Sequence, residues 1–215
     1  MQKVIVLFGK PGSGKGSRLS EFLEKTDRKF DILSVGQKLR QARDEQTELG
    51  KKATPYMESG DLVPDDIING IVIESLKKSE IPVIADGFPR TVAQAQAMLD
   101  AGVIPVVINF HLDDEIIIER CRCRIVCQNS SCGETYSTDG FKSPKVDGIC
   151  DKCGSPLGRR PDDDPEVVKN RLAVYQEKTF PVVDLFKNNG VEIYHVDTTI
   201  TKVGRQQFAD IMNSL

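Results

Sequence analysis

The chemistry-bearing residues nearest the N-terminus form a glycine-rich run that contains a lysine. Residues 9–17 read G-K-P-G-S-G-K-G-S and come directly after the apolar run Val4–Phe8. In a turn between a strand and a helix, backbone N–H groups and the helix N-terminus can surround a phosphate. Lys15 adds a point charge that can reach the β- and γ-phosphates of a nucleotide. In the usual pattern a Ser or Thr follows the lysine directly, but here Gly16 stands at that position and the hydroxyl comes one residue later, at Ser17. This order favours kinases of small nucleotides over GTPases and motor ATPases.

A second motif follows another predicted strand. Residues 86–90 read D-G-F-P-R and come directly after the apolar run Ile81–Ala85. Ligands of open α/β sheets bind at the carboxyl ends of the strands, so we expect this motif on the same rim as the glycine-rich run. There Asp86 is placed to orient magnesium-bound water, and Arg90 is placed to clamp a phosphate.

Other arginines occur near the predicted lobe boundaries, and beside a phosphate loop they favour phosphate contacts. This set is Arg40, Arg120, Arg124, Arg160 and Arg171. We interpret Arg18, Arg28 and Arg205 instead as solvated helix charges. His111 and His195 follow apolar strands, and we expect packed strand-end residues there rather than catalysts.

The six cysteines all lie between positions 121 and 153, and their clustering favours metal ligands over disulfides. Cys127 and Cys132 form a C-x4-C knuckle, and Cys150 and Cys153 form a C-x2-C knuckle seventeen residues later. A glycine follows the second cysteine of each pair, as in small zinc ribbons. Four thiolates make a closed structural site with no open position for a reacting water. Cys123 is a rival to Cys127 as a ligand, and iron or cobalt could occupy the same sulfur site.

Composition is typical of one globular chain. The 215 residues are 28% charged and 39% hydrophobic, with a formal net charge of −3 and pI ≈ 5.5. The acidic balance argues against nucleic acid or an anionic membrane as a partner. No apolar stretch is long enough to span a bilayer, and the N-terminal run is too short for a signal peptide. We therefore expect a cytoplasmic protein with reduced thiols.

Apolar strands alternate with helical patterns, which predicts a parallel α/β sheet covered on both faces. The predicted strands are Val4–Phe8, Ile81–Ala85, Val103–Phe110 and Val191–Val196. The predicted helices are Ser17–Leu23, Pro64–Lys77, Thr91–Ala101, Asp113–Arg124 and Pro165–Lys187.

Two segments interrupt this alternation. Residues 34–63 carry helical patterns without a good strand, which indicates a small helical insertion. Residues 124–162 are rich in Gly, Pro, Ser and Cys and lack helical periodicity, which indicates a metal-stapled lobe rather than a plain loop. The core domain is then expected to comprise residues 1–33, 64–123 and 163–215.

Taken together, these motifs resemble the adenylate kinase family in its longer form with a zinc-bearing lid. The resemblance covers essentially the whole chain. It rests on residues 9–17, on D-G-F-P-R-T at 86–91 with Gln94, on the two cysteine knuckles, and on R-P-D-D-D at 160–164. It implies an α/β fold: a P-loop kinase core whose parallel β-sheet is flanked by helices, an AMP-binding helical lobe at 34–63, and a metal-binding lid with four cysteine ligands at 124–162.

The resemblance also implies roles for individual residues. The positions implied to contact ATP are Gly12, Ser13, Gly14, Lys15, Gly16, Ser17, Arg120, Arg124, Thr135, Tyr136 and Ile200. The positions implied to contact AMP are Val35, Arg40, Met57, Asp61, Leu62, Val63, Gly87, Phe88, Pro89, Arg90, Gln94, Arg160 and Arg171. Those implied to serve catalysis are Lys15, Arg90, Arg124, Arg160 and Arg171. Asp86 and Ser17 are implied to orient magnesium-bound water, and Gln94 to read the AMP adenine.

Four positions depart from the family pattern. Val35 stands where a threonine usually touches the AMP base, and Gln37 replaces an aspartate of the D-x-x-R pattern. Thr198 replaces a glycine beside ATP, and Cys123 replaces a glycine before the lid. These changes could weaken affinity or alter base selectivity, but they remove no phosphate ligand.

The expected activity is reversible, Mg²⁺-dependent transfer of phosphate between ATP and AMP to give two ADP, with structural Zn²⁺ in the lid. We expect a monomer whose partners are these small molecules, with no nucleic acid and no membrane. The alternatives are a kinase of UMP, CMP or GMP, a zinc-ribbon nucleic-acid module with a nucleotide switch, and a catalytically dead nucleotide-binding protein.

Overall fold

A central parallel sheet organises the chain in the computed structural model, which describes residues 4–140 and 142–215. Within these residues the sheet has five strands in the order β2-β3-β1-β4-β8, all parallel. The strands are β1 (Val4–Gly9), β2 (Asp31–Ser34), β3 (Val83–Asp86), β4 (Pro105–His111) and β8 (Ile193–Asp197). Strands β2 and β3 lie on one side of β1, and the later strands β4 and β8 lie on the other. Where the strand order reverses in this way, a crevice opens at the carboxyl ends of the strands, here those of β1, β3 and β4.

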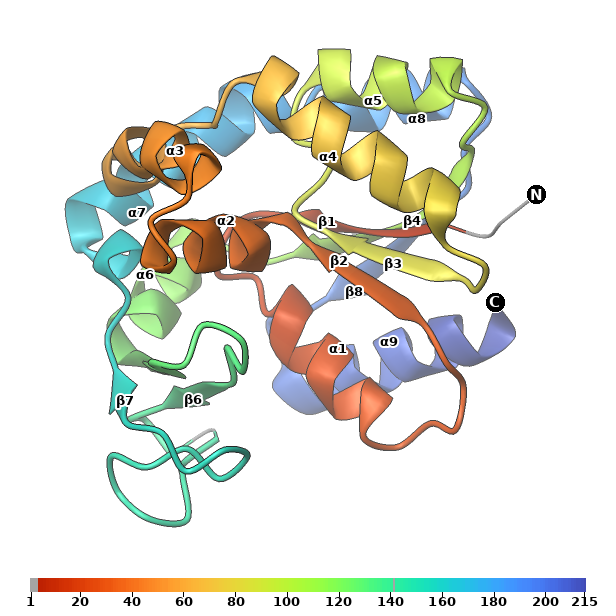
Figure 1. The fold of residues 1–215 in the computed structure, drawn as a ribbon. Helices are drawn as coiled ribbons and strands as arrows, with labels where there is room; N and C mark the ends of the chain where they lie inside the picture. The colour runs from red at the N-terminus through yellow and green to blue at the C-terminus, as the bar shows by residue number, and fades with distance from the viewer. Residues whose placement is uncertain (1–3, 141) are drawn as a thin grey trace.

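Both faces of the sheet are buried, as the apolar runs predict. Along β1, alternate residues point to opposite faces. Val4 and Val6 pack in the larger hydrophobic cluster, whereas Ile5 and Leu7 pack in a second one. The larger cluster includes residues of α4 (Asp65–Lys78), α5 (Val92–Asp100) and α8 (Val182–Asn188). The second cluster includes residues of α1 (Lys15–Leu23) and α9 (Thr201–Ser214), on the opposite side of the sheet (Figure 1).

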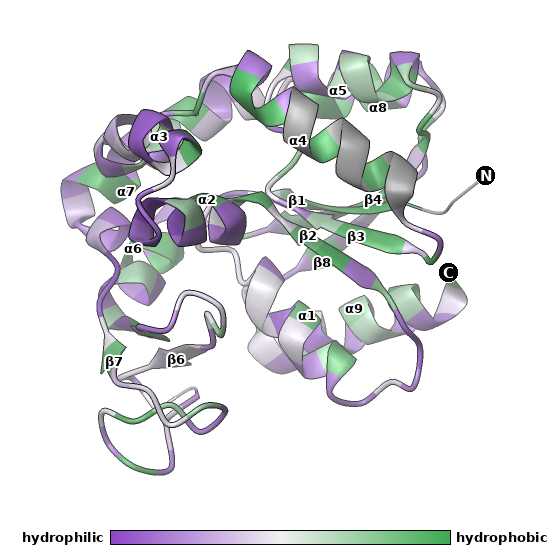
Figure 2. Ribbon diagram, in the orientation of Figure 1, coloured by the Kyte–Doolittle hydropathy of each residue, from purple (hydrophilic) through white to green (hydrophobic). Residues whose placement is uncertain are grey.

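Hydropathy follows this layering. In Figure 2 the central strands are mostly green, and the helices alternate between green and purple around their axes. This pattern is that of amphipathic helices laid on an apolar sheet. No described helix combines the length and the apolar character that crossing a membrane requires.

The first interruption is helical. It contains α2 (Val35–Asp44) and α3 (Glu48–Ser59), which pack against each other. Thr47 caps α3 by accepting a hydrogen bond from the Gly50 N–H. Gly50 lies so close to α2 that a Cβ there would come 2.1 Å from the Ala42 carbonyl oxygen, which explains why a glycine occupies this position.

The second interruption is a small antiparallel sheet with long loops. Its strands are β5 (Arg124–Cys127), β6 (Thr135–Ser137) and β7 (Leu157–Gly158), in the order β6-β5-β7. The chain enters it from α6 (Asp114–Cys123) and leaves through the 3-10 turn η1 (Pro161–Asp163) into α7 (Pro165–Val174). These short strands were not predicted, although the absence of helix in this segment was.

Two further predictions about elements were incomplete. The strand β2 was missed because only Leu33 of its four residues is buried, so it shows no apolar run. The single helix predicted over Pro165–Lys187 is three pieces: α7, a π-helical turn η2 (Tyr175–Thr179) and α8. The Phe180 N–H bonds the Tyr175 carbonyl, and the following Pro181 has no N–H to continue the ladder.

Of the residues expected to be ordinary strand-end or surface groups, several have specific partners. His111 and His195 are exposed, and His111 Nε2 lies 2.8 Å from His195 Nδ1, so the expectation that they are packed was wrong. Arg28 donates to the Met212 carbonyl, and Arg205 pairs with Glu21.

Candidate active site and metal centre

The glycine-rich run forms a tight loop between β1 and α1, as predicted. Gly14 caps α1 in the left-handed region, with φ of 87°. At Gly9 a Cβ would come 2.5 Å from the Phe110 carbonyl oxygen, so only glycine fits against β4. Lys15 folds back over the loop and donates to the Gly9 and Lys10 carbonyls, each at 2.8 Å. The loop therefore holds its lysine in place at the edge of the sheet.

A cleft of about 880 Å³ opens above this loop. It is bounded by the loop, by α2 and by the small antiparallel sheet, and it brings together nearly all the residues predicted to contact nucleotides. The exceptions are Ser13, Phe88 and Ile200, which do not line it. Ser13 and the Phe88 side chain are buried, whereas Ile200 is 63% exposed and its neighbour Thr201 lines the cleft.

Positive charge dominates the cleft. Nine arginines line it together with Lys15, and five of them were predicted to contact the phosphates from the AMP lobe, the lid and the end of β3: Arg40, Arg90, Arg124, Arg160 and Arg171. Burial lowers the pKa of Lys15 to about 8; Asp86 opposes this shift, and neighbouring arginines reinforce it. Burial and neighbouring arginines also lower the pKa of Arg160 to about 9. The same two causes lower the pKa of Arg90. Cations this close together each make the charged form of the others less stable. Such a group of cations forms a binding site for a polyanion.

Two aspartates hold the arginines in place. Arg171 Nη1 lies 3.0 Å from Asp162 Oδ2 and also donates to the Asp162 carbonyl at 2.8 Å. Burial alone would raise the pKa of Asp162, but Arg171 and its neighbours outweigh burial and lower it. Arg124 makes a two-point ion pair with Asp163. These aspartates belong to the R-P-D-D-D run, and the sequence did not by itself indicate that they orient arginines.

The four predicted thiolates come together in the small sheet. The Sγ atoms of Cys127, Cys132, Cys150 and Cys153 all lie within 4.8 Å of one another. Cys127 and Cys153 are 3.3 Å apart, and Cys132 and Cys150 are 3.8 Å apart. Tetrahedral zinc with bonds of about 2.3 Å places sulfurs about 3.8 Å apart, so the cluster fits the ion. Cys123 lies outside the cluster and contacts Glu119 Oε1 instead, so it is not a rival ligand.

Sequence comparison shows the family. A profile of the adenylate kinase family matches residues 7–191. The chain belongs to the adenylate kinase family. It is 40% identical to an adenylate kinase of Caldicellulosiruptor saccharolyticus over 96% of this chain and 94% of that protein. It is 42% identical to one of Staphylococcus aureus over 87% and 88%, and 40% identical to one of Archaeoglobus fulgidus over 91% and 90%. The predicted nucleoside monophosphate kinase activity is thereby confirmed.

In this adenylate kinase the predicted base-reading residue already has protein partners. Gln94 is 3% exposed, and its Oε1 accepts from the Arg90 N–H at 2.7 Å. Its Nε2 donates to Asp65 Oδ1 at 2.7 Å, and Thr91 donates to the other oxygen of Asp65. Gln94 also lines the cleft, so its contact with the base stays a prediction. Asp65, which fixes the amide orientation, was not identified from the sequence.

At the predicted ATP end, Thr198 is buried and hydrogen-bonded to the end of β4. Its hydroxyl and its N–H both donate to the His111 carbonyl, at 2.9 and 3.0 Å. Its own carbonyl accepts from Arg120 Nη2 at 2.8 Å, which holds the arginine predicted to stack on adenine. The hydroxyl of Tyr136 faces the metal cluster: it contacts Cys150 Sγ and accepts from the Asp151 N–H. Tyr136 also lines the cleft, and its contact with ATP stays a prediction.

Arg18 is the clearest correction at this end of the kinase. It was expected to be a solvated helix charge, but it is only 5% exposed. Its Nε and Nη2 have no hydrogen-bond partner among the described residues, and its Nη1 donates weakly to the Gly14 carbonyl. Burial lowers its pKa to about 10, with Arg120 and Arg205 adding to the effect. Because Arg18 precedes the buried Phe22 by four residues on α1, helical periodicity could have revealed its burial.

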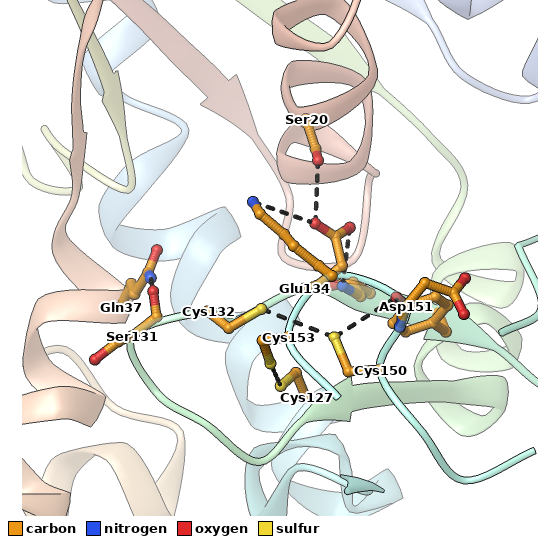
Figure 3. Close-up of polar contacts among 12 residues, drawn as sticks. Ser20, Gln37, Cys127, Ser131, Cys132, Glu134, Cys150, Asp151 and Cys153 are labelled. Atoms are coloured by element: carbon orange, nitrogen blue, oxygen red, sulfur yellow. Dashed lines mark hydrogen bonds and ion pairs between the residues drawn. The ribbon is translucent and has the colours of Figure 1, made fainter. Parts of the chain in front are cut away.

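Glu134 is a lid residue that the sequence did not single out. It is 8% exposed and accepts from Lys142 Nζ at 2.6 Å. Ser20 of α1 donates to its other oxygen at 3.4 Å. Figure 3 shows Glu134 between α1 and the cysteine cluster, so one carboxylate joins the lid to the core.

Proposed function

We propose that the five arginines and Lys15 of this adenylate kinase align Mg–ATP with AMP and neutralise the phosphoryl group as it passes between them, giving two ADP. One observation carries this assignment of roles: all six cations line a single cleft that runs from the phosphate loop to α2. The attacking oxygen of the AMP phosphate is already anionic, so no general base is needed. Alignment and electrostatic stabilisation then account for the catalysis.

The division of labour follows from position. Gly12 to Ser17 cradle the ATP phosphates, and Lys15 contacts the transferred group. Arg40 and Arg90 hold the AMP phosphate from the α2 side and from the end of β3. Arg124, Arg160 and Arg171 approach from the lid and its base. Asp86 and Ser17 would orient the water bound to magnesium, and the ion would supply charge neutralisation for the phosphates.

We assign three working parts to the chain: a core of residues 1–33, 64–123 and 163–215, an AMP lobe of residues 34–63, and a lid of residues 124–162. Water must be excluded, because otherwise ATP would be hydrolysed. A lid that closes only over both nucleotides provides this exclusion. The four thiolates would hold zinc as a structural ion that ties the lid loops together.

The acceptor is AMP rather than another monophosphate. Gln94 supports this choice, because its amide, oriented by Asp65, can donate to and accept from the adenine edge. Val35 argues against AMP as the acceptor, since its buried apolar side chain offers no polar contact to the adenine base. The test is the rate of phosphoryl transfer from ATP to AMP, UMP, CMP and GMP, and a preference for any of the last three would overturn the assignment.

Two variants test the roles of the cations. Lys15→Met and Arg90→Ala should each lower phosphoryl transfer by about 10³-fold or more, as expected for cations that stabilise the transferring group. The circular dichroism spectrum and Tm should stay close to wild type. Turnover like that of the wild type in either variant would refute the role assigned to that residue.

The active unit is one chain in a reducing compartment. A single polypeptide supplies all the cleft-lining groups named above, which supports a monomer. No disulfide joins any of the six cysteines, which supports a cytoplasmic location. Sedimentation equilibrium with and without nucleotides tests the first point, and cell fractionation tests the second.

A further inference from the structure

Gln37 joins two parts of the molecule that are far apart in sequence. It lies on α2 and replaces the aspartate of the family's D-x-x-R pattern. Its Nε2 lies 3.3 Å from the carbonyl oxygens of both Ser130 and Ser131, more than ninety residues away. These serines lie between Cys127 and Cys132, in the segment that we call the first knuckle (residues 127–132). Figure 3 shows Gln37 reaching this segment beside the cysteine cluster.

The approach of α2 to the first knuckle is close. Gly133, directly after it, has φ of +60°, and a Cβ there would come 3.3 Å from Gln37 Nε2. The knuckle is itself a defined turn, because the N–H groups of Cys132 and Gly133 both donate to the Asn129 carbonyl at 3.0 Å. Gln37 therefore bonds to backbone oxygens whose positions are set by a turn and by two metal-binding thiolates.

Charge explains why an uncharged donor suits this position. Arg40 follows Gln37 by three residues on α2, so the two side chains share a helix face. Across the cleft stand Arg124 and Arg160 of the lid, whose charges disfavour that of Arg40. Asp162 of the same segment attracts Arg40, so charges of both signs act between α2 and the lid. An amide N–H₂ can bridge them because it offers donors to carbonyl oxygens without adding charge.

We propose that Gln37 is a positioning residue that fastens α2 to the first knuckle of the metal-bound lid, and so brings Arg40 to the AMP phosphate when the lid closes. The inference rests on the proposed function, because AMP is the ligand that Arg40 is assigned to hold. The cysteines of the first knuckle would hold the metal, and the bound ion would then fix the carbonyl groups that accept from Gln37.

The test compares Gln37→Ala and Gln37→Glu with Gln41→Ala. Gln41 is the matched control, since it lies one turn further along the same helix and its side chain donates to Glu45, the residue at the C-terminal cap of that helix. Because both contacts are long, we count them together as about one neutral hydrogen bond, which corresponds to about three- to tenfold in equilibrium. Gln37→Ala should therefore raise the KM for AMP about three- to tenfold at saturating Mg–ATP, with kcat unchanged or higher. Gln37→Glu should raise it further, because a carboxylate would face two carbonyl oxygens.

A second readout is independent of turnover. With ATP and AMP both bound, trypsin should cleave the lid of Gln37→Ala faster than that of the wild type, whereas the two should be cleaved alike without nucleotides. Zinc content and Tm should be equal in all variants. If Gln37→Ala matches Gln41→Ala in KM and in cleavage, or if it loses kcat with an unchanged KM, the inference is wrong. The wild type and Gln41→Ala also show whether the proposed reaction takes place. If neither forms ADP from ATP and AMP, the proposed function fails, and this result is distinct from a failure of the inference about Gln37.

Discussion

Arg124 and Asp163 close the base of the lid. Arg124 Nε donates to Asp163 Oδ2 at 2.8 Å, and its Nη2 donates to Oδ1. Arg124 begins β5 and Asp163 ends η1, so the pair joins the two points at which the chain enters and leaves the lid. Burial disfavours charge on Arg124, but the hydrogen bonds and charge of Asp163 outweigh it and raise the pKa of Arg124.

Loss of this carboxylate should therefore be costly. Asp163→Ala leaves the Arg124 charge buried without its partner, which should destabilise the protein by about 3 kcal/mol. For a chain of this size we expect Tm to fall by about 6–12 °C in calorimetry. The control is Glu166→Gln, which breaks the exposed pair with Lys169 and should change stability by less than about 0.5 kcal/mol. Equal Tm values for the two variants would show that the pair at the lid base contributes nothing.

The lowered pKa of Lys15 predicts proton uptake on ATP binding. Because this pKa is about 8, the amine is mostly neutral at pH 9, and the phosphates of ATP raise its pKa again. ATP binding at pH 9 should therefore take up close to one proton, and ATP affinity should fall as pH rises through 8. At pH 6.5 the amine is charged in both states, so uptake should vanish.

Titration calorimetry in two buffers of different ionisation enthalpy measures this uptake. Lys15→Met should abolish it, whereas Lys25→Met, at an exposed pair with Glu21, should leave it unchanged. Proton uptake that persists in Lys15→Met would assign the titration to another group.

Removal of metal should destabilise the lid. Structural zinc contributes about 10 kcal/mol or more in small domains. Chelation or Cys132→Ser should therefore lower Tm by at least about 20 °C, since 1 kcal/mol corresponds to about 2–4 °C here. Cys123→Ser is the control, because Cys123 lies outside the cluster, and it should retain both metal and Tm. An unchanged Tm after confirmed metal removal would contradict a structural role.

The buried guanidinium of Arg18 predicts a stabilising substitution. Two of its nitrogens have no partner among the described residues, and the folded state carries this penalty at neutral pH. Arg18→Met fills a similar volume without charge, so it should raise stability by about 1–2 kcal/mol and Tm by a few degrees. Differential scanning calorimetry without nucleotides is the measurement, and a lower Tm would show that Arg18 has a stabilising partner after all.

The local motifs could be read directly from the sequence. The phosphate loop after β1 and the cysteine knuckles depend on residues a few positions apart, and short-range backbone geometry fixes what such residues can do. The apolar runs of β1, β3, β4 and β8 likewise predicted a buried parallel sheet, since both faces of each strand had to be covered.

The partners of individual side chains depended on tertiary structure. Periodicity indicates that a face is buried, but it does not say what covers that face. It therefore could not pair Gln94 with Asp65, Arg124 with Asp163, or Gln37 with the first knuckle. Each of these contacts joins residues from different elements. Such a contact can stabilise the protein only after the packing of sheet, α2 and lid has brought the elements together.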